Sequence, residues 1–278
     1  MPSFKYSQLG NVKIAGMRVY TVAFLFLAFT WIVAYWMMYR ASKGHVPHVR
    51  HLAAFDSINE AIGRAAEMGK PVHFTTGHSG GGMYSSIAGE HMAGFSLLSY
   101  VARQCAEKDA RLITTVSFSE MIQIAEDVIS NAAIAVGRPD YFQKDMVRFA
   151  SDNWLGYDMY AMSVIGEEQC AANIMIGAMD STSSMIISAG GAVQGAIGIG
   201  GASGTGVSGP SSIAPFIVFC DYVLIGEETP AAGAIVSGDV DSLSGTVSSD
   251  YVKVISILAI LAGTVMISLG INMGWFTV

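Results

Sequence analysis

The chain has 278 residues, of which 52% are hydrophobic and 13% are charged, whereas charged residues make up about a quarter of a typical globular protein. This deficit of charge argues against an ordinary soluble enzyme. The mean hydropathy of +0.46 excludes an intrinsically disordered, collagen-like or nucleic-acid-coating chain.

The hydrophobic excess lies at both ends of the chain. Residues Val19–Tyr39 form a run of 21 uncharged residues, and Val254–Val278 form a run of 25. As helices they would be about 31 and 37 Å long, enough to cross a hydrocarbon core of about 30 Å. The alternative for the first run, a cleaved signal peptide, is disfavoured by its long apolar core and by Arg40, which stands where small residues are expected. We therefore expect two transmembrane helices.

Both expected helices carry aromatic residues of the kind that anchor spans at the membrane interface, namely Tyr20, Tyr35, Trp36, Tyr39, Tyr251 and Trp275. In the second run, small residues four positions apart would allow close helix packing: Ala259 with Gly263, and Gly270 with Gly274. Neither run contains an ionisable residue, which argues against a transporter or a channel.

Two spans place both termini on one side of the membrane and the middle of the chain on the other. The expected organisation is a tail (1–18), a span (19–39), a linker (40–51), an extramembrane domain (52–250) and a second span (254–278). Positive residues flank both sides almost equally, so charge does not decide the orientation. Cysteines Cys105, Cys170 and Cys220 are odd in number and lie in apolar surroundings, which favours reduced thiols and a cytoplasmic domain on a prokaryotic cell membrane.

The middle of the chain alternates between helical and extended patterns. Helices are expected over 52–68, 96–106 and 121–136, the last opened by a capping box at Ser117–Glu120. Strands are expected over 71–75, 112–116, 159–165, 185–188 and 215–225. Such alternation predicts an α/β, Rossmann-like layered domain with a largely parallel sheet.

Charge is divided unevenly within this domain. Residues 1–148 contain 14 Lys and Arg and 11 Asp and Glu, whereas residues 149–252 contain 11 acids and no Lys or Arg. The second half would repel nucleic acid and anionic lipid, so a partner bound by charge would be cationic. The alternative is a solvated acidic face.

A stretch without charge, residues 181–220, is rich in Gly, Ala and Ser. It admits three interpretations: a phosphate-binding loop, a mobile lid, or small-residue surfaces that pack closely against another helix or subunit. Gly204, Gly206 and Gly209 fit the dinucleotide pattern G-x-G-x-x-G, but Pro210 follows where a helix should begin.

A second glycine-rich motif, G-x-S-x-G, directly follows the expected strand 71–75 and consists of Gly77, His78, Ser79, Gly80 and Gly81. In α/β-hydrolases this spacing holds a nucleophilic serine on a tight turn. The triad, however, needs a histidine late in the chain, and the last histidine here is His91. A triad of Ser79 with His78 or His91 and Glu90 is conceivable, but the motif more simply predicts a turn that shapes a ligand pocket at the carboxyl edge of the sheet.

Two other patterns have plain structural explanations. His45, His48 and His51 recur every third residue and could approach a metal, but Pro47 interrupts a helix there, so they are interpreted as a juxtamembrane linker. The pairs Glu167–Glu168 and Glu227–Glu228 are interpreted as acids at helix N-termini or as surface charge, because adjacent side chains point apart. No metal and no cofactor is expected.

The segment from Thr76 to Thr115, with residues 137–149 and 186–201, resembles an uncharacterised family of prokaryotic membrane-anchored proteins. This resemblance covers most of residues 50–240 and implies no activity. Two functions stay open. The first is a non-enzymatic scaffold that oligomerises, or docks partner proteins, at the lipid bilayer. The second is a membrane-tethered ligand-binding or hydrolytic domain with its pocket near Thr76–Met83 and 189–209.

Overall fold

The fold comes from a computed structural model, which describes residues 13–14, 17–43, 53–202, 209–226, 228–238, 240–268 and 276–277. The chain divides into two compact units. The terminal unit contains Met1–Val49 and Asp239–Val278, and the central unit contains Arg50–Gly238.

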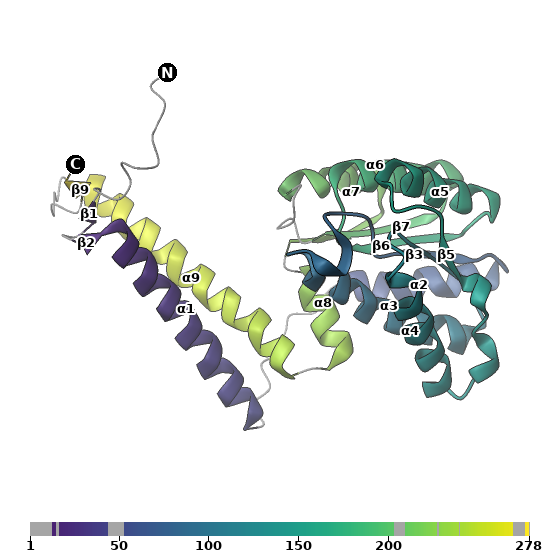
Figure 1. The fold of residues 1–278 in the computed structure, drawn as a ribbon, viewed down its shortest axis with the longest axis horizontal. Coiled ribbons are helices and arrows are strands. Elements are labelled where there is room, and N and C mark those ends of the chain that lie inside the picture. Colours follow the sequence, from purple (N-terminus) through teal and green to yellow (C-terminus); the bar gives the residue numbers. More distant parts are fainter. Residues whose placement is uncertain are drawn as a thin grey trace, which may run out of the picture. The chain divides into compact units, whose positions relative to one another are not determined.

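The terminal unit is built around two long helices, α1 (Val19–Ser42) and α9 (Val240–Ser268), which lie side by side (Figure 1). Short strands near both chain ends pair antiparallel in the order β2-β1-β9, with bounds Lys13–Ile14 (β1), Met17–Arg18 (β2) and Phe276–Thr277 (β9). Within the residues that the structure describes, no helix combines the length and the hydropathy needed to cross a bilayer, so the two predicted spans are not confirmed.

The central unit is an α/β domain around a six-stranded parallel sheet, which confirms the predicted fold class for this part of the chain. The strand order is β5-β4-β3-β6-β7-β8. The strands are β3 (Val72–Thr75), β4 (Leu112–Val116), β5 (Val147–Phe149), β6 (Ala172–Gly177), β7 (Ile197–Ala202) and β8 (Tyr222–Ile225). Strands β3, β4 and β6 are buried along their whole length, as expected for the middle of a parallel sheet.

Helices cover both faces of the sheet (Figure 1). One face carries α2 (Ala53–Glu67), α3 (Ala88–Lys108), α4 (Met121–Ala135) and α8 (Glu228–Ser237), and the other carries α5 (Trp154–Glu167), α6 (Ser181–Gln194) and α7 (Ala214–Phe219). Short 3-10 turns occur at Gly82–Tyr84, Pro139–Tyr141, Lys144–Met146 and Gly209–Ser212.

Each face of the sheet has its own hydrophobic core. The core under α3 includes Phe74, Leu98 and Leu112, and the core under α5 and α6 includes Tyr157 and Ile187, all of them buried. Each such side chain contributes about 1.5–3 kcal/mol when it leaves water, so these two layers supply most of the stability of the domain.

The helix at 52–68 and the strands at 71–75 and 112–116 are confirmed, but several other predicted elements are wrong. The segments Met159–Ile165 and Met185–Ser188 lie in helices α5 and α6, not in strands. Both helices begin at a side-chain cap, which the prediction from the apolar residues did not take into account. Asn153 accepts hydrogen bonds from the amides of Leu155 and Gly156, and Asp180 accepts them from the amides of Thr182 and Ser183.

The predicted strand Pro215–Ile225 is half helix, because residues up to Phe219 form α7 and only Tyr222–Ile225 form β8. The capping box is also wrong. Helix α4 starts after Glu120 without a side-chain cap, and the Ser117 hydroxyl donates instead to the carbonyl of Gly77 (2.8 Å). That bond joins the ends of β4 and β3.

The described part of the uncharged stretch 181–220 is folded into α6, β7 and α7. Its glycines allow close packing inside the domain. A Cβ atom on Gly190 would lie 2.5 Å from Met162 Cγ of α5, and one on Gly200 would lie 2.5 Å from the Phe216 ring of α7. Larger residues at these positions would push the helices off the sheet and off each other.

Candidate functional site

The six strands are parallel, but they are added to the sheet in two opposite directions, and these directions diverge at one place. From β3 the chain continues outward to β4 and β5, then crosses back to β6 on the other side of β3 and continues to β7 and β8. This is the strand order of dinucleotide-binding folds, in which ligands bind beyond the carboxyl ends of the two central strands. The switch point here lies between β3 and β6.

The predicted motif Gly77–Gly81 lies at this point, in the loop that leaves β3. Gly77 has a φ of +79°, and a Cβ atom there would lie 2.5 Å from the carbonyl oxygen of Ala178 in the loop that leaves β6. The amide of Asp180 donates to the carbonyl of His78 (3.2 Å). The two loops at the switch point are therefore in direct contact, and only glycine fits at Gly77.

His78 is almost buried beneath this loop. Its ring stacks on Phe118 with 4.9 Å between centroids, and it lies 6.0 Å from the Tyr157 ring. Its Nε2 atom lies 3.3 Å from the carbonyl oxygen of Asp152, whereas Nδ1 has no hydrogen-bond partner. Ser79 is buried beside it, while Gly80 and Gly81 are exposed and form the outer rim of the loop.

His91, in the first turns of α3, is fully buried and packs edge-on against Phe118 at 6.3 Å. Burial lowers the pKa of His91 to about 4, only partly opposed by the nearby Ser79 backbone, so the imidazole is neutral at neutral pH. No well-formed hydrogen bond reaches either ring nitrogen. None joins the Ser79 hydroxyl to His78 or His91 among the described residues, so a preformed Ser–His pair is not part of the site.

Asp158 is a buried carboxyl group in the second turn of α5. It faces Ser183 and Asp180 on α6, and burial raises its pKa to about 7, with Asp180 adding to the increase and Ser183 opposing it. Neither carboxyl oxygen, nor the Ser183 hydroxyl, has a well-formed hydrogen bond. At neutral pH this carboxyl group is half protonated and can either donate or accept a hydrogen bond.

These groups all follow strands at the carboxyl edge of the sheet, and we call them together the carboxyl-edge cluster: Thr76, His78, Ser79, His91, Asp158 and Ser183. Buried polar atoms without partners are rare in folded proteins and call for an explanation. Within the described residues no group of three or more His, Cys, Asp or Glu side chains is arranged to hold a metal ion. The cluster offers two imidazoles, three hydroxyl groups and a carboxyl group, which suit hydrogen bonding to a polar molecule.

The other predicted site residues lie elsewhere. Gly204 and Gly206 lie outside the described residues, and Gly209 begins a 3-10 turn. Ala259 and Gly263 belong to α9, whereas Gly270 and Gly274 lie outside the described residues. The same is true of the histidines at 45, 48 and 51 and of Glu227.

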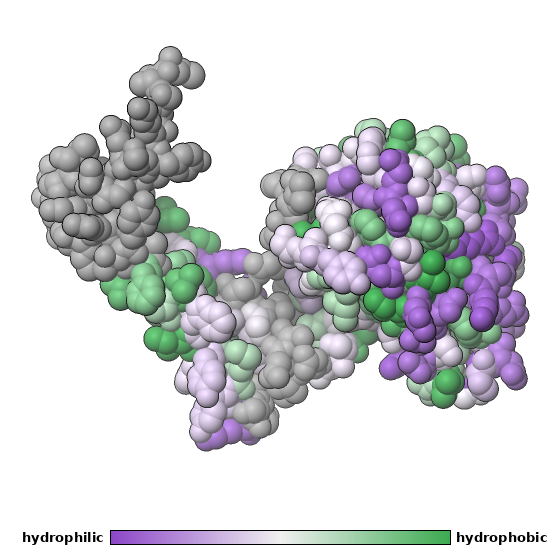
Figure 2. All heavy atoms as spheres, viewed as in Figure 1, coloured by the Kyte–Doolittle hydropathy of each residue, from purple (hydrophilic) through white to green (hydrophobic). Residues whose placement is uncertain are grey.

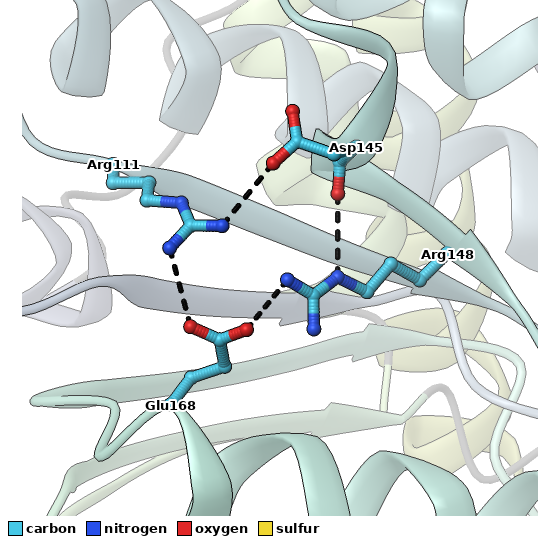
Figure 3. A network of polar contacts seen from close by, with 4 residues as sticks. All are labelled: Arg111, Asp145, Arg148 and Glu168. Atoms are coloured by element: carbon cyan, nitrogen blue, oxygen red, sulfur yellow. Dashed lines mark hydrogen bonds and ion pairs between the residues drawn. The ribbon is translucent and has the colours of Figure 1, made fainter.

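A second polar group lies at the opposite edge of the sheet. It includes Glu168, which is the C-cap residue of α5 and belongs to an ion-pair network that the sequence analysis did not find. Arg111 pairs with both Asp145 (3.2 Å) and Glu168 (3.2 Å), and Glu168 also pairs with Arg148 (2.6 Å), as Figure 3 shows. The hydrogen bond from Arg148 is the main reason why the pKa of Glu168 is lowered. This network ties β4 and β5 to the end of α5, so its evident role is structural.

Next to this network lies a cavity of about 480 Å³, lined by residues from the ends of α3 and α4 and the starts of β4 and β5: Asp109, Arg111, Gly137, Arg138, Pro139, Asp140, Tyr141, Gln143 and Met146. Arg138 is already paired with Asp109 (2.6 Å) and with the carbonyl of Ala106 (2.6 Å). Arg111 is paired as well, so the cavity offers no guanidinium that lacks a partner.

The chain belongs to a family described as a domain of unknown function (DUF6754), whose model matches residues 11–277. The predicted resemblance to an uncharacterised family is thereby confirmed. No curated protein and no solved structure shows significant similarity to the chain.

Proposed function

We propose that this member of the DUF6754 family is a membrane-anchored ligand-binding protein that holds a small polar molecule at the switch point between β3 and β6. The observation that carries the proposal is the carboxyl-edge cluster, in which Nδ1 of His78 has no hydrogen-bond partner and neither His91 nor Asp158 makes a well-formed hydrogen bond. Each such atom costs about 1–3 kcal/mol relative to one that is hydrogen-bonded. A ligand that supplies the missing partners would recover that free energy.

The location of the cluster supports the same function. It lies where parallel α/β sheets bind ligands, and the loop above it is rich in glycine. Gly80 and Gly82 both have a φ of +63°. Tyr84, 89% exposed, lies on the rim of this loop.

The anchoring part of the proposal rests on the terminal unit. Large apolar side chains of α1 are exposed, including Phe24 (67%), Trp31 (69%) and Ile32 (66%), and hydrophobic residues of this helix pair are green in Figure 2. Helix α9 likewise exposes Leu258 and Ile260. An apolar surface of this kind is costly in water and is matched by lipid. The 21 uncharged residues Val19–Tyr39 remain the basis for a span.

Hydrogen exchange tests the ligand site. The full chain in mild detergent is incubated with a mixture of small polar metabolites, and exchange is measured peptide by peptide. We expect slower exchange in two segments only, Thr76–Tyr84 and Ala178–Ser184. Unchanged exchange in both segments with every fraction of the mixture would contradict a ligand site at the switch point.

Extraction of membranes tests the anchor. Membranes from cells that produce the full chain are washed at high pH, which releases peripheral proteins but not spanning ones. We expect the chain to stay in the pellet, and a variant with Leu25→Lys and Ile32→Lys to appear in the supernatant. Release of the unaltered chain into the supernatant would contradict the proposed membrane anchor but would not contradict the proposed ligand site.

Assembly into a scaffold is the second candidate function. The edge strand β8 and helix α7 expose apolar residues, namely Ile217 (62%), Val218 (72%), Phe219 (38%), Tyr222 (39%) and Ile225 (53%). An exposed strand edge of this type can pair with another chain. The native mass in mild detergent decides this candidate: a defined oligomer that dissociates in the Ile225→Lys variant supports it, and a monomer contradicts it.

A further inference from the structure

We infer that the C-terminal end of helix α1 binds the head groups of anionic phospholipids through two basic residues, each of which lies over an aromatic ring. The residues are Trp36, Tyr39, Arg40 and Lys43, which we call the basic-aromatic end of α1. The inference rests on the membrane anchor of the proposed function, because it names the class of lipid that the anchor contacts. It does not depend on the ligand site at the switch point.

The surface of α1 before this end is apolar around most of the helix. Of the described side chains from Phe24 to Tyr39, only Met37 is buried, although α9 packs along the same helix. A helix that is apolar on all sides needs an apolar environment on all sides, and one neighbouring helix covers only a stripe of it. We therefore expect lipid tails to surround α1 up to its basic-aromatic end.

Positive charge begins where the apolar run ends. Helix α1 contains no acid, Arg40 lies in its last turn, and Lys43 follows the helix directly. Both side chains are exposed, and among the residues that the structure describes no carboxylate forms an ion pair with either of them. The two positive charges can therefore pair with an anionic group from outside the chain.

Aromatic rings hold both basic side chains at the helix surface. The guanidinium carbon of Arg40 lies 5.5 Å from the centroid of the Trp36 ring, and Nζ of Lys43 lies 4.4 Å from the centroid of the Tyr39 ring. Trp36 and Tyr39 are 53% and 52% exposed. Tryptophan and tyrosine favour the level of the lipid head groups, and Arg and Lys next to them extend toward the phosphates. A cation over a ring face still has N–H groups that can donate to phosphate oxygens.

The combination of charge and apolar surface favours a lipid over a soluble anion. A soluble phosphate compound would contact only two exposed charges, whose attraction salt screens. A phospholipid contacts the same charges and also covers the apolar surface of α1 with its acyl chains. Each basic residue near an anionic membrane surface strengthens the attraction by about fivefold. The basic-aromatic end thus fits an anionic leaflet better than any soluble phosphate.

Native mass spectrometry of the full chain in mild detergent tests the inference. The chain is mixed with equal amounts of phosphatidylglycerol, which is anionic, and phosphatidylcholine, which is zwitterionic, both with the same acyl chains. We expect phosphatidylglycerol to bind in preference. In the variant with Arg40→Gln and Lys43→Gln the preference should fall by about fivefold or more. Lys144→Gln removes an exposed charge from the central unit and should leave the preference unchanged.

Three results would overturn the inference: equal binding of the two lipids, a preference that persists in the double variant, or displacement of phosphatidylglycerol by glycerol 3-phosphate, which has no acyl chains. Should the double variant fail to fold, high salt replaces it, because salt screens both charges and should lower the preference. The extraction test decides the anchor separately. A chain that stays in the membrane pellet but binds both lipids equally keeps the anchor and loses the anionic-lipid site.

Discussion

The amide of Asp180 donates a hydrogen bond to the carbonyl of His78 over 3.2 Å, and this bond joins two loops that lie about a hundred residues apart in the sequence. The bond connects the loop that leaves β3 to the loop that leaves β6, at the switch point between these strands. The two residues that it joins carry the buried His78 ring, which stacks on Phe118, and the Asp180 side chain, which caps α6. Mutations that separate the two loops should therefore damage the candidate site before they damage the sheet.

Gly77→Ala tests this contact. The new Cβ atom would lie 2.1 Å from Met179 Sδ and 2.5 Å from the Ala178 oxygen, at a φ of +79°. We expect a loss of about 2–4 kcal/mol in the free energy of unfolding, measured by denaturant titration. Gly137→Ala is the matched control, since its φ is +75° but nothing lies within 4 Å, and it should cost about 1 kcal/mol. Equal losses in the free energy of unfolding for Gly77→Ala and Gly137→Ala would show that the loops after β3 and β6 are not in contact in solution.

Asp158→Asn should remove a destabilisation that depends on pH. The pKa of Asp158 is raised to about 7, so the folded state holds its proton more tightly than the unfolded state, whose carboxyl group ionises near pH 4. Its contribution to stability is full below about pH 4 and is lost as the pH rises to 7. The variant should thus match the wild type at pH 4 and exceed its stability by roughly 2–4 kcal/mol at pH 8. Parallel pH profiles of the two proteins would contradict the raised pKa.

His91→Leu should protect the protein against acid. The pKa of His91 is lowered to about 4, so its contribution is full above pH 6.5 and is lost as the pH falls from 6.5 to 4. Removing the ring removes this loss, and it also removes two buried nitrogens without well-formed hydrogen bonds. We expect little change in the free energy of unfolding at pH 7.5 and a gain of roughly 2 kcal/mol at pH 4.5.

His73 is the matched control for His91, because burial also lowers its pKa to about 4 but both of its nitrogens are bonded. Nδ1 donates to Asn173 Oδ1 (2.8 Å), and Nε2 accepts from the Thr115 hydroxyl (3.0 Å). His73→Leu leaves these partners buried and unsatisfied, so it should cost about 1–3 kcal/mol at pH 7.5. A similar effect of both substitutions at that pH would contradict the different bonding of the two rings.

Glu168→Gln should weaken the network at the amino edge. Glu168 contacts Arg148 at 2.6 Å and Arg111 at 3.2 Å, and its side chain is 25% exposed. We expect a loss of about 1–2 kcal/mol in the free energy of unfolding, reduced at high salt. Glu60→Gln breaks the exposed Arg64–Glu60 pair within α2 and should cost less than about 0.5 kcal/mol. If Glu168→Gln lowers the free energy of unfolding by no more than Glu60→Gln does, the network stabilises the fold no more than an exposed ion pair.

The elements that the sequence predicts correctly share a simple property: the pattern inside the element and the residues that flank it indicate the same secondary structure and the same ends. Strand β4 is a short buried run between the αL residue Asp109 and Ser117, and α2 ends at Gly69, whose φ is +62°. The wrong elements are apolar runs whose length suits either a strand or a piece of helix. In α5 the deciding feature was the Asn153 cap, which stands before the run that suggested a strand.

The glycine-rich loop after β3 was correctly placed at a carboxyl edge from its motif alone, because strand, turn and small residues follow one another in the sequence. The partners of that loop could not be found in this way. Asp158 and His91 lie on helices on opposite faces of the sheet, and nothing in the local pattern of either helix marks a buried polar residue as part of a site.

By itself, the sequence determined the α/β class, the apolar ends of the chain, the acidic second half and the turn at Gly77–Gly81, since each depends on composition or on neighbouring residues. Only the tertiary structure decided that β3 and β6 are adjacent, that Asp180 caps α6 beside the loop that leaves β3, and that buried polar groups from helices on both faces lie at the carboxyl edge of the sheet. The reason is physical. Parallel pairing joins strands separated by whole helices, and burial depends on what packs above a residue, which its neighbours in the chain do not specify.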